Sequence, residues 1–157
     1  MTLTVRPMAV DDVPGCLRIV NHIIAVGGTT AYEAPFTEAE FEAHYLHEPP
    51  ISHVALLGRA VVGFQAVFDV GDGLYSIGSF TDRQQPVRGA GRALFDATLA
   101  ACRARGGVAI LAKITADNVP GLAYYTRMGF ADWQVWPGDA ARNGKPVDRV
   151  VKRYPLD

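Results

Sequence analysis

Residues 74–115 read LYSIGSFTDRQQPVRGAGRALFDATLAACRARGGVAILAKIT, and this segment predicts the centre of the architecture. Leu74–Thr81 is typical of a strand. Apolar residues then recur at helical spacing from about Gly91 to Arg105, and Gly106–Gly107 ends the predicted helix. Val108–Thr115 is a second strand. Because a helix separates the two strands, they can run parallel as a βαβ unit.

The chain before this segment predicts an antiparallel meander and two helices. Thr37 and Glu40 form a T-x-x-E capping box, which is typical of a helix start. Asp11 precedes apolar residues at helical spacing and is the expected N-cap of the first helix. The predicted strands here are Leu3–Arg6, His53–Leu57 and Ala60–Val70.

The chain after it adds a short helix and a closing pair of strands. Pro120 falls in the first turn of this helix and Gly129 is its expected stop. The closing strands are Phe130–Trp136 and Val147–Tyr154, joined by a polar loop with a turn at Asn143–Gly144. The whole order predicts one domain of the mixed α+β class, with a central, mostly antiparallel sheet flanked by helices.

Length and composition agree with one domain, residues 1–157, and exclude several classes of protein. Hydrophobic residues make up 49% of the chain and charged residues 20%, as in ordinary globular domains. A net charge of -1 argues against a general nucleic-acid binder. No apolar run approaches the roughly 20 residues that span a bilayer, and the first residues lack a secretory signal. Cys16 and Cys102 are expected to be reduced core thiols, as in a cytoplasmic protein.

Pro86–Ala93 reads PVRGAGRA and lies between a predicted strand and the start of a predicted helix. A glycine-rich turn at this place lets backbone N–H groups converge on an anion, and the helix N-terminus adds about half a positive charge. Arg88 and Arg92 add mobile positive charge, so a phosphate or pyrophosphate is the natural ligand. The alternative is a plain tight turn with two surface arginines. P-loop, Rossmann, zinc-ligand and serine-hydrolase motifs do not fit, and no metal site is expected.

Asn118–Phe130 reads NVPGLAYYTRMGF and is the second informative segment. Asn118 can bond local backbone or a ligand amide. Tyr125 lies two helical turns further on; alternatively, Tyr124 and Tyr125 are amphipathic packing residues. Together with the glycine-rich turn, this segment resembles the GNAT superfamily of acyl-CoA-dependent N-acyltransferases. The first motif is R/Q-x-x-G-x-G/A; the second is N-x-x-A-x-x-x-Y-x-K-x-G-F, with Gly and Arg here in place of its Ala and Lys.

The resemblance implies that acetyl-CoA is the co-substrate and assigns residues to it. The backbone amides from Arg88 to Ala93 would hold its pyrophosphate, and Phe80 and Thr81 would pair with pantetheine where the two parallel strands splay apart. Asn118 would anchor the pantetheine. The Tyr125 hydroxyl would protonate the departing thiolate, for which its ordinary pKa of about 10 is suitable. The cofactor-binding set is Phe80, Thr81, Arg88, Gly89, Ala90, Gly91, Arg92, Ala93 and Asn118.

The N-terminal third is similar to the phosphinothricin-acetyltransferase-like branch of that family. That branch has an Asn-containing first helix followed by a Thr-aromatic-acidic-Pro loop, and this similarity implies that Asn21, Tyr32 and Glu33 bind substrate. The chain departs from the family in two respects. The connection from Asp82 to Arg88 is a residue or two longer than is usual in the family, and many relatives carry a Glu base on the central strand, whereas Leu74–Thr81 has no acidic residue. Asp82, Glu33 or a chain of waters could instead take the proton from the amine.

These observations favour an N-acetyltransferase that acts on a primary amine of a small molecule, an amino acid or analogue, by direct attack in a ternary complex. Two alternatives stay open, namely acetylation of a protein or peptide and a non-catalytic acyl-CoA-binding module. No nucleic-acid or membrane partner is expected. A homodimer is possible, since Val147–Tyr154, with Trp133 and Trp136 nearby, could pack across a two-fold axis.

Overall fold

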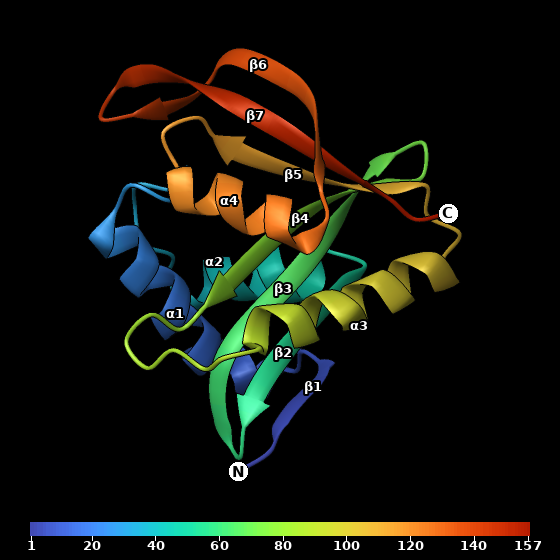
Figure 1. Cartoon of the computed structure of the whole chain (residues 1–157). Coiled ribbons are helices and arrows are strands. Elements are labelled where there is room, and N and C mark those ends of the chain that lie inside the picture. Colours follow the sequence, from blue (N-terminus) through green and yellow to red (C-terminus); the bar gives the residue numbers. More distant parts are fainter.

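The meander forms the centre of a seven-stranded sheet in the computed structural model, which describes residues 1–157. The strand order is β1-β2-β3-β4-β5-β7-β6, and only β4 and β5 pair in parallel (Figure 1). This confirms the predicted mixed, mostly antiparallel sheet. The strands are β1 Leu3–Pro7, β2 Ile51–Leu57, β3 Ala60–Gly71, β4 Leu74–Thr81, β5 Ala109–Thr115, β6 Ala131–Arg142 and β7 Lys145–Pro155.

The parallel pairing of β4 with β5 is short. It joins Leu74–Ser76 to Ala109–Leu111 and then stops, so the last five residues of β4 have no partner on that side. On its other edge β5 stays paired with β7 from Ala109 to Thr115. The two central strands therefore splay apart toward their C-terminal ends, as the resemblance implied.

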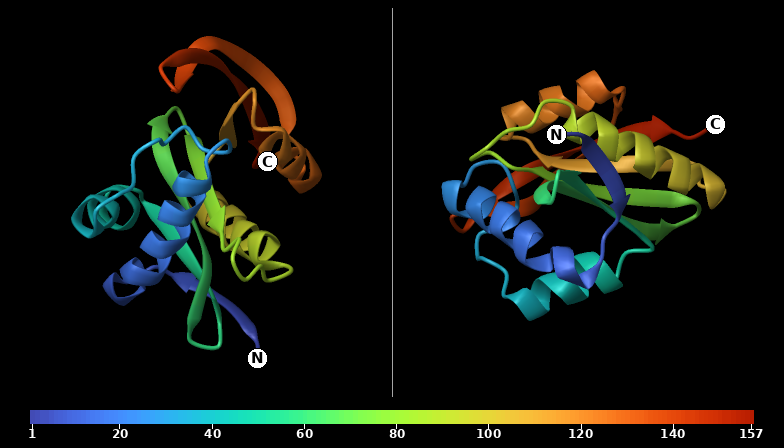
Figure 2. Two further views of the ribbon diagram at one scale, coloured as in Figure 1. Left: turned by 90° about the vertical axis from the view of Figure 1, so that its left-hand side faces the viewer. Right: turned by 90° about the horizontal axis from the view of Figure 1, so that it is seen from below.

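Helices cover both faces of the sheet. Figure 2 shows α1 (Val13–Val26) and α2 (Glu38–Phe41) on one side, and α3 (Ala90–Ala104) and α4 (Val119–Met128) on the other. Each face of the sheet has its own hydrophobic core, because side chains along β2 point alternately to the two faces. Val54 packs with side chains of α1 and α2, and Ala55 packs with α3. Cys16 and Cys102 are fully buried free thiols, one in each layer. No helix in this chain combines the length and the apolar character that crossing a bilayer demands.

The predicted helix starts are partly right. The Thr37–Glu40 capping box is present, with Glu40 N–H donating to Thr37 Oγ1 at 3.1 Å and Thr37 N–H to Glu40 Oε1 at 2.9 Å. After Phe41 the helix continues as a π-helical turn, η2 (Glu42–His47). Asp11 is not the N-cap of α1. Instead a 3-10 turn, η1 (Val10–Asp12), precedes the helix, and the Asp12 carboxylate accepts the Ala9 N–H at 2.8 Å.

The closing hairpin differs from the prediction. Its strands extend to a two-residue turn at Asn143–Gly144, where both residues have positive φ (52° and 77°), so the predicted polar loop is wrong. The hairpin arches away from the core at the top of Figure 1, and most of its side chains there are exposed. A segment that is exposed on both faces has no alternation of apolar and polar residues from which a strand could be predicted.

Candidate active site

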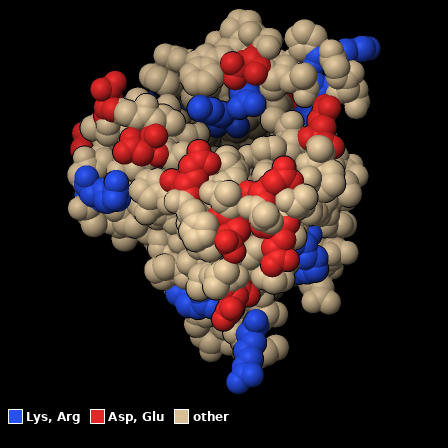
Figure 3. Space-filling model, turned by 180° about the vertical axis from the view of Figure 1, so that it is seen from behind, with Lys and Arg blue, Asp and Glu red and all other residues tan.

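The splay between β4 and β5 opens into a cavity of about 760 Å³. Its walls include Ser76–Thr81 of β4, Lys113–Thr115 of β5, one face of α4 and the loop Thr29–Tyr32. Basic side chains outnumber acidic ones around it. The basic residues are Arg83, Lys113, Arg127 and Arg149, and the acidic ones are Glu48 and Asp69. Figure 3 shows a hollow below the β6–β7 hairpin with Lys and Arg side chains beside it and acidic side chains further down the same face.

Two tyrosines of α4 line this cavity. Tyr125 is half-buried, and burial raises the pKa of its hydroxyl well above the ordinary value, so the phenol is protonated at neutral pH. Burial also raises the pKa of Tyr124. The Tyr124 hydroxyl lies beside Ser79, but not in hydrogen-bonding geometry, and is left without a partner. A protonated phenol and a buried unpaired hydroxyl are suited to a polar ligand inside the cavity.

The glycine-rich turn meets the cavity at Tyr124. A Cβ added to Gly91 would lie 2.6 Å from the Tyr124 hydroxyl, and Gly89 is the N-cap of α3 with φ 87°. Among the six amides predicted to hold pyrophosphate, Ala90 N–H donates to Val87 O at 3.3 Å and Ala93 N–H to Gly89 O at 2.9 Å. The other four donate to no protein acceptor. They are the N–H groups of Arg88, Gly89, Gly91 and Arg92, at the N-terminus of a 15-residue helix.

Asn118 is already engaged within the protein. Its Oδ1 accepts the Gly121 N–H at 3.0 Å and so caps α4, while its Nδ2 donates to Thr29 O at 2.6 Å. A Cβ at Gly121 would collide with the Asn118 side chain, which explains Gly in place of the Ala of the family motif. The structure thus places Asn118 at the cavity wall as a link between α4 and the loop that precedes α2.

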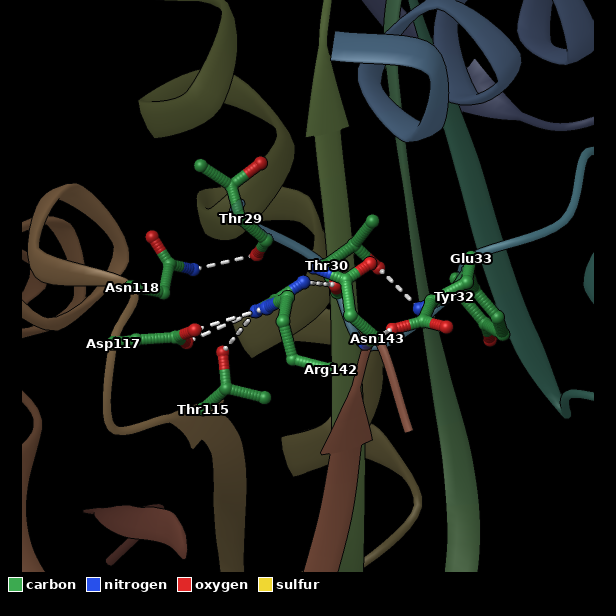
Figure 4. A network of polar contacts seen from close by, with 9 residues as sticks. All are labelled: Thr29, Thr30, Tyr32, Glu33, Thr115, Asp117, Asn118, Arg142 and Asn143. Atoms are coloured by element: carbon green, nitrogen blue, oxygen red, sulfur yellow. Dashed lines mark hydrogen bonds and ion pairs between the residues drawn. The ribbon is translucent and has the colours of Figure 1, made fainter. Parts of the chain in front are cut away.

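A polar network extends this link to the β6–β7 hairpin (Figure 4). Arg142 bonds the Asp117 carboxylate through two nitrogens, both at 2.9 Å, and also donates to Thr30 O at 2.6 Å. The Glu33 carboxylate accepts the Asn143 N–H at 2.7 Å. The loop around residues 29–33 is therefore held from two sides, by β5–α4 and by the hairpin.

The predicted substrate residues have different surroundings. Tyr32 lines the cavity, whereas Glu33 is exposed and does not. Asn21 makes two hydrogen bonds to the backbone of Phe36, at 2.9 and 3.0 Å, and so ties the loop to α1. Phe80 and Thr81 line the cavity at the free edge of β4.

Asp82, one of the expected bases, points elsewhere. It is 6% exposed and pairs with Arg18 at 2.9 Å, outside the cavity. Burial alone would raise the pKa of this carboxyl, but hydrogen bonds from Arg18 and from the Gln84 and Gln85 N–H groups lower it overall. An ionised carboxylate bound to a guanidinium in this way is a structural anchor.

Several residues of the cavity wall could not be predicted from the sequence. Among them are His44, Tyr45 and Glu48, from η2 and the residue after it, and Arg149 from β7. They come from segments far apart in the chain, and no short motif marks them. The available signal was the run of His, Tyr and Glu after the capping box, which suits neither a purely apolar nor a purely solvent-exposed helix face.

Comparison with known proteins agrees with this geometry. The model of the acetyltransferase (GNAT) family matches residues 23–130. An L-methionine sulfoximine/L-methionine sulfone acetyltransferase of Pseudomonas paraeruginosa is 29% identical over 168 residues, covering 100% of this chain and 96% of that protein. An N-acetyltransferase of Staphylococcus aureus superposes with a TM-score of 0.86 at 17% identity, covering 100% of both chains.

A phosphinothricin acetyltransferase of Sinorhizobium meliloti, solved with acetyl-CoA, superposes with a TM-score of 0.81 at 23% identity, covering 99% of this chain and 89% of that one. The family match covers more than half of the chain. The splayed strands and the open amides at the start of α3 agree with it. The chain belongs to the acetyltransferase (GNAT) family and is an acetyl-CoA-dependent N-acetyltransferase.

Proposed function

We propose that this enzyme acetylates the primary amine of a small amino acid or amino-acid analogue by direct attack within a ternary complex. The observation that carries the proposal is the cavity at the splay, with the protonated Tyr125 phenol and a surplus of basic side chains in its walls. Such a surplus favours an anionic acceptor such as an α-carboxylate. The names of the Pseudomonas and Sinorhizobium relatives point to the same class.

The co-substrate would bind between the two halves of the splay. The free edge of β4 at Phe80 and Thr81 would pair with pantetheine as an added strand, and the N–H groups of Gly89 and Gly91 would bind the pyrophosphate. Ala90 and Ala93 contribute by shaping the turn, because their own N–H groups are used. Asn118 holds this part of the cavity wall in position, because its side chain caps α4 and also donates a hydrogen bond to the backbone of Thr29.

The residues of this chain position the two reactants and supply the proton for the departing thiolate. The Tyr125 hydroxyl protonates the thiolate as the C–S bond breaks, and free N–H groups of β4 stabilise the tetrahedral oxyanion. Tyr32 contacts the acceptor directly, while Asn21 and Glu33 hold the loop that carries Tyr32. Holding both reactants in one cavity removes much of the entropic barrier to a bimolecular reaction.

A panel of amines tests the proposal, with release of free CoA as the readout. Methionine sulfoximine, methionine sulfone and phosphinothricin should be acetylated with a higher kcat/KM than peptides or polyamines. Preference for a peptide N-terminus would move the acceptor class to proteins. Tight acetyl-CoA binding without transfer to any amine would make the chain a binding module.

We further propose that the enzyme works in the cytoplasm as a homodimer. Trp133 and Val135 on β6 are 43% and 58% exposed, and two free buried thiols suit a reducing compartment. Light scattering should give twice the chain mass, and Trp133→Lys should return it to one. A monomeric wild type at micromolar concentration would remove the dimer from the proposal.

A further inference from the structure

The reaction proposed above needs a group that takes a proton from the acceptor, because a protonated amine cannot attack a thioester. The central strand β4 supplies no acidic side chain. Asp82 is paired with Arg18, and Glu33 is bonded to Asn143 outside the cavity. Neither carboxylate faces the cavity, so we looked for a base among the other side chains of its wall.

A chain of four hydrogen-bonded side chains lies in that wall. Tyr45 Oη donates to Tyr32 Oη at 2.9 Å, Tyr32 Oη lies 3.1 Å from His44 Nε2, and His44 Nδ1 lies 2.9 Å from Glu48 Oε2. One arrangement of protons satisfies every bond. Because Tyr32 accepts from Tyr45, it donates its own proton to Nε2, which leaves the imidazole proton on Nδ1 facing the carboxylate.

Aromatic packing holds these four side chains in place beside the splay between β4 and β5. The His44 ring stacks on Phe68 at 5.0 Å between centroids and on Phe36 at 6.0 Å. Tyr45 is only 2% exposed, and its hydroxyl would lie 3.9 Å from a Cβ placed on Gly78 of β4. At the other end the Glu48 side chain is 60% exposed, so a proton can leave to solvent.

We propose that Tyr32, His44 and Glu48 form a proton relay in which Tyr32 takes a proton from the acceptor ammonium and passes its own to His44 Nε2. The imidazolium is then paired with the Glu48 carboxylate and later releases its proton to water. The amine nitrogen then adds to the thioester carbon and forms the C–N bond, and the C–S bond breaks when the tetrahedral oxyanion collapses. The nitrogen loses a second proton, which restores Tyr125 after that phenol has protonated the thiolate. Tyr32 is the catalytic residue here, and Glu48 is a positioning residue.

The surrounding charges are compatible with this direction of transfer. Burial raises the pKa of Tyr32, while the Tyr45 hydrogen bond and the positive charge of Arg149 act to lower it. Glu48 and Asp69 are the acidic groups in the cavity wall, and Glu48 is the one in contact with the ring. A relay that ends on an ionised carboxylate stabilises the imidazolium formed during the reaction.

The test compares His44→Gln with His47→Gln. His47 lies on the same turn and pairs with Glu42 at 3.3 Å, but its side chain is 65% exposed and outside the cavity. With an amino-acid acceptor at pH 7, we expect His44→Gln to lower kcat about a hundredfold and to leave the Kd for acetyl-CoA unchanged. The loss should shrink as pH rises toward the pKa of the acceptor amine, because solvent then supplies the free amine. His47→Gln should match the wild type throughout.

The second part of the experiment uses an acceptor amine that is already unprotonated at neutral pH. Such a weakly basic amine needs no proton removed before attack, so the ratio of wild-type kcat to His44→Gln kcat should be much smaller with it than with the amino-acid acceptor. With the basic acceptor, the kcat of Glu48→Gln should lie between those of the wild type and His44→Gln. With the weakly basic acceptor, Glu48→Gln should show no such loss. An equal loss with both amines would overturn the relay in favour of a packing role, as would a His44→Gln enzyme without defect.

This inference rests on the proposed function, and the two can fail separately. If the wild type acetylates none of the amino-acid analogues but does acetylate another basic amine, the acceptor class is wrong, and the comparison of basic with weakly basic amines still tests the relay. If the analogues are good acceptors and His44→Gln is unimpaired, the relay alone is wrong.

Discussion

At the scale of single residues, Tyr125 carries the clearest prediction. Tyr125→Phe removes the only proton that this side chain can give to the departing thiolate, so kcat should fall about a hundredfold with an unchanged Kd for acetyl-CoA. Tyr154→Phe is the control, because Tyr154 packs on Phe95 and Phe130 and does not line the cavity. Stopped-flow and steady-state turnover measure the effect. A Tyr125→Phe enzyme with full turnover would remove the acid role.

Gly89 gives a prediction about the pyrophosphate site. Gly89 has φ 87°, a conformation in which a β-branched residue is strained, and Gly89→Val would also crowd the open amides of the turn. Gly106→Val is the matched control, since Gly106 has φ 74° and lies in open space beyond the other end of α3. Both variants should lose similar stability in thermal unfolding. Only Gly89→Val should weaken CoA binding by calorimetry; an equal loss of affinity in both would place the pyrophosphate elsewhere.

At the scale of elements, Asp117 and Arg142 connect the β6–β7 hairpin to the β5–α4 corner. The Arg142 hydrogen bond holds the pKa of Asp117 at about 2, below its ordinary 3.8. The carboxyl with the lowered pKa stabilises the fold above pH 3.8, and this contribution disappears as pH falls toward 2. Since the Asp117 side chain is 43% exposed, the stabilisation is at most about 1 kcal/mol.

Denaturant unfolding at several pH values checks this. Asp117→Asn should be less stable than the wild type at pH 7, and the difference should vanish between pH 4 and 2. Asp96→Asn, which breaks an exposed pair with Arg92, should change stability little at any pH. A difference between Asp117→Asn and the wild type that persists below pH 2 would mean that packing, rather than charge, explains it.

The elements that sequence could predict are those with local causes. The Thr37–Glu40 box, the stop at Gly129 and the turn at Asn143–Gly144 depend on neighbouring residues and were found. Asp12, rather than Asp11, organises the start of α1 because its carboxylate also binds Arg6 on β1, a contact that depends on the sheet. The ends of β6 and β7 were missed for the same kind of reason, because their pairing depends on the hairpin as a whole.

The same division holds for the site. Motif spacing led to Tyr125 and to the glycine-rich turn, both of which the structure brings to the cavity or its edge. It could not show that Asn118 is engaged with Thr29, or that Asp82 is paired with Arg18. His44 reaches the wall only because η2 packs across β3 from a distant part of the chain. Residues joined by tertiary contacts leave no spacing that a single sequence displays.

At the scale of the whole molecule, the splay is the place where the fewest backbone hydrogen bonds join two neighbouring strands of the sheet. Beyond Ser76 no backbone bond joins β4 to β5, so the half that contains β1–β4 and the half that contains β5–β7 meet there through side chains alone. A ligand that pairs with the free edge of β4 and also contacts α3 and α4 would join the two halves. Acetyl-CoA should therefore stabilise the native state cooperatively and protect amides on both sides of the splay.

Thermal unfolding and hydrogen exchange measure this directly. At a concentration one hundred times its Kd, acetyl-CoA should add about 2.7 kcal/mol, which for a chain of this size raises Tm by roughly 5–10 °C. The slowed amides should include the N–H groups of β4 residues 77–81 that face away from β3, and those of Gly91 and Arg92 at the start of α3, which donate to no protein acceptor. Gly89→Val should lose both effects under the same conditions. If acetyl-CoA raised Tm without slowing hydrogen exchange in β4, the co-substrate would bind outside the splay. The active site would then lie elsewhere as well.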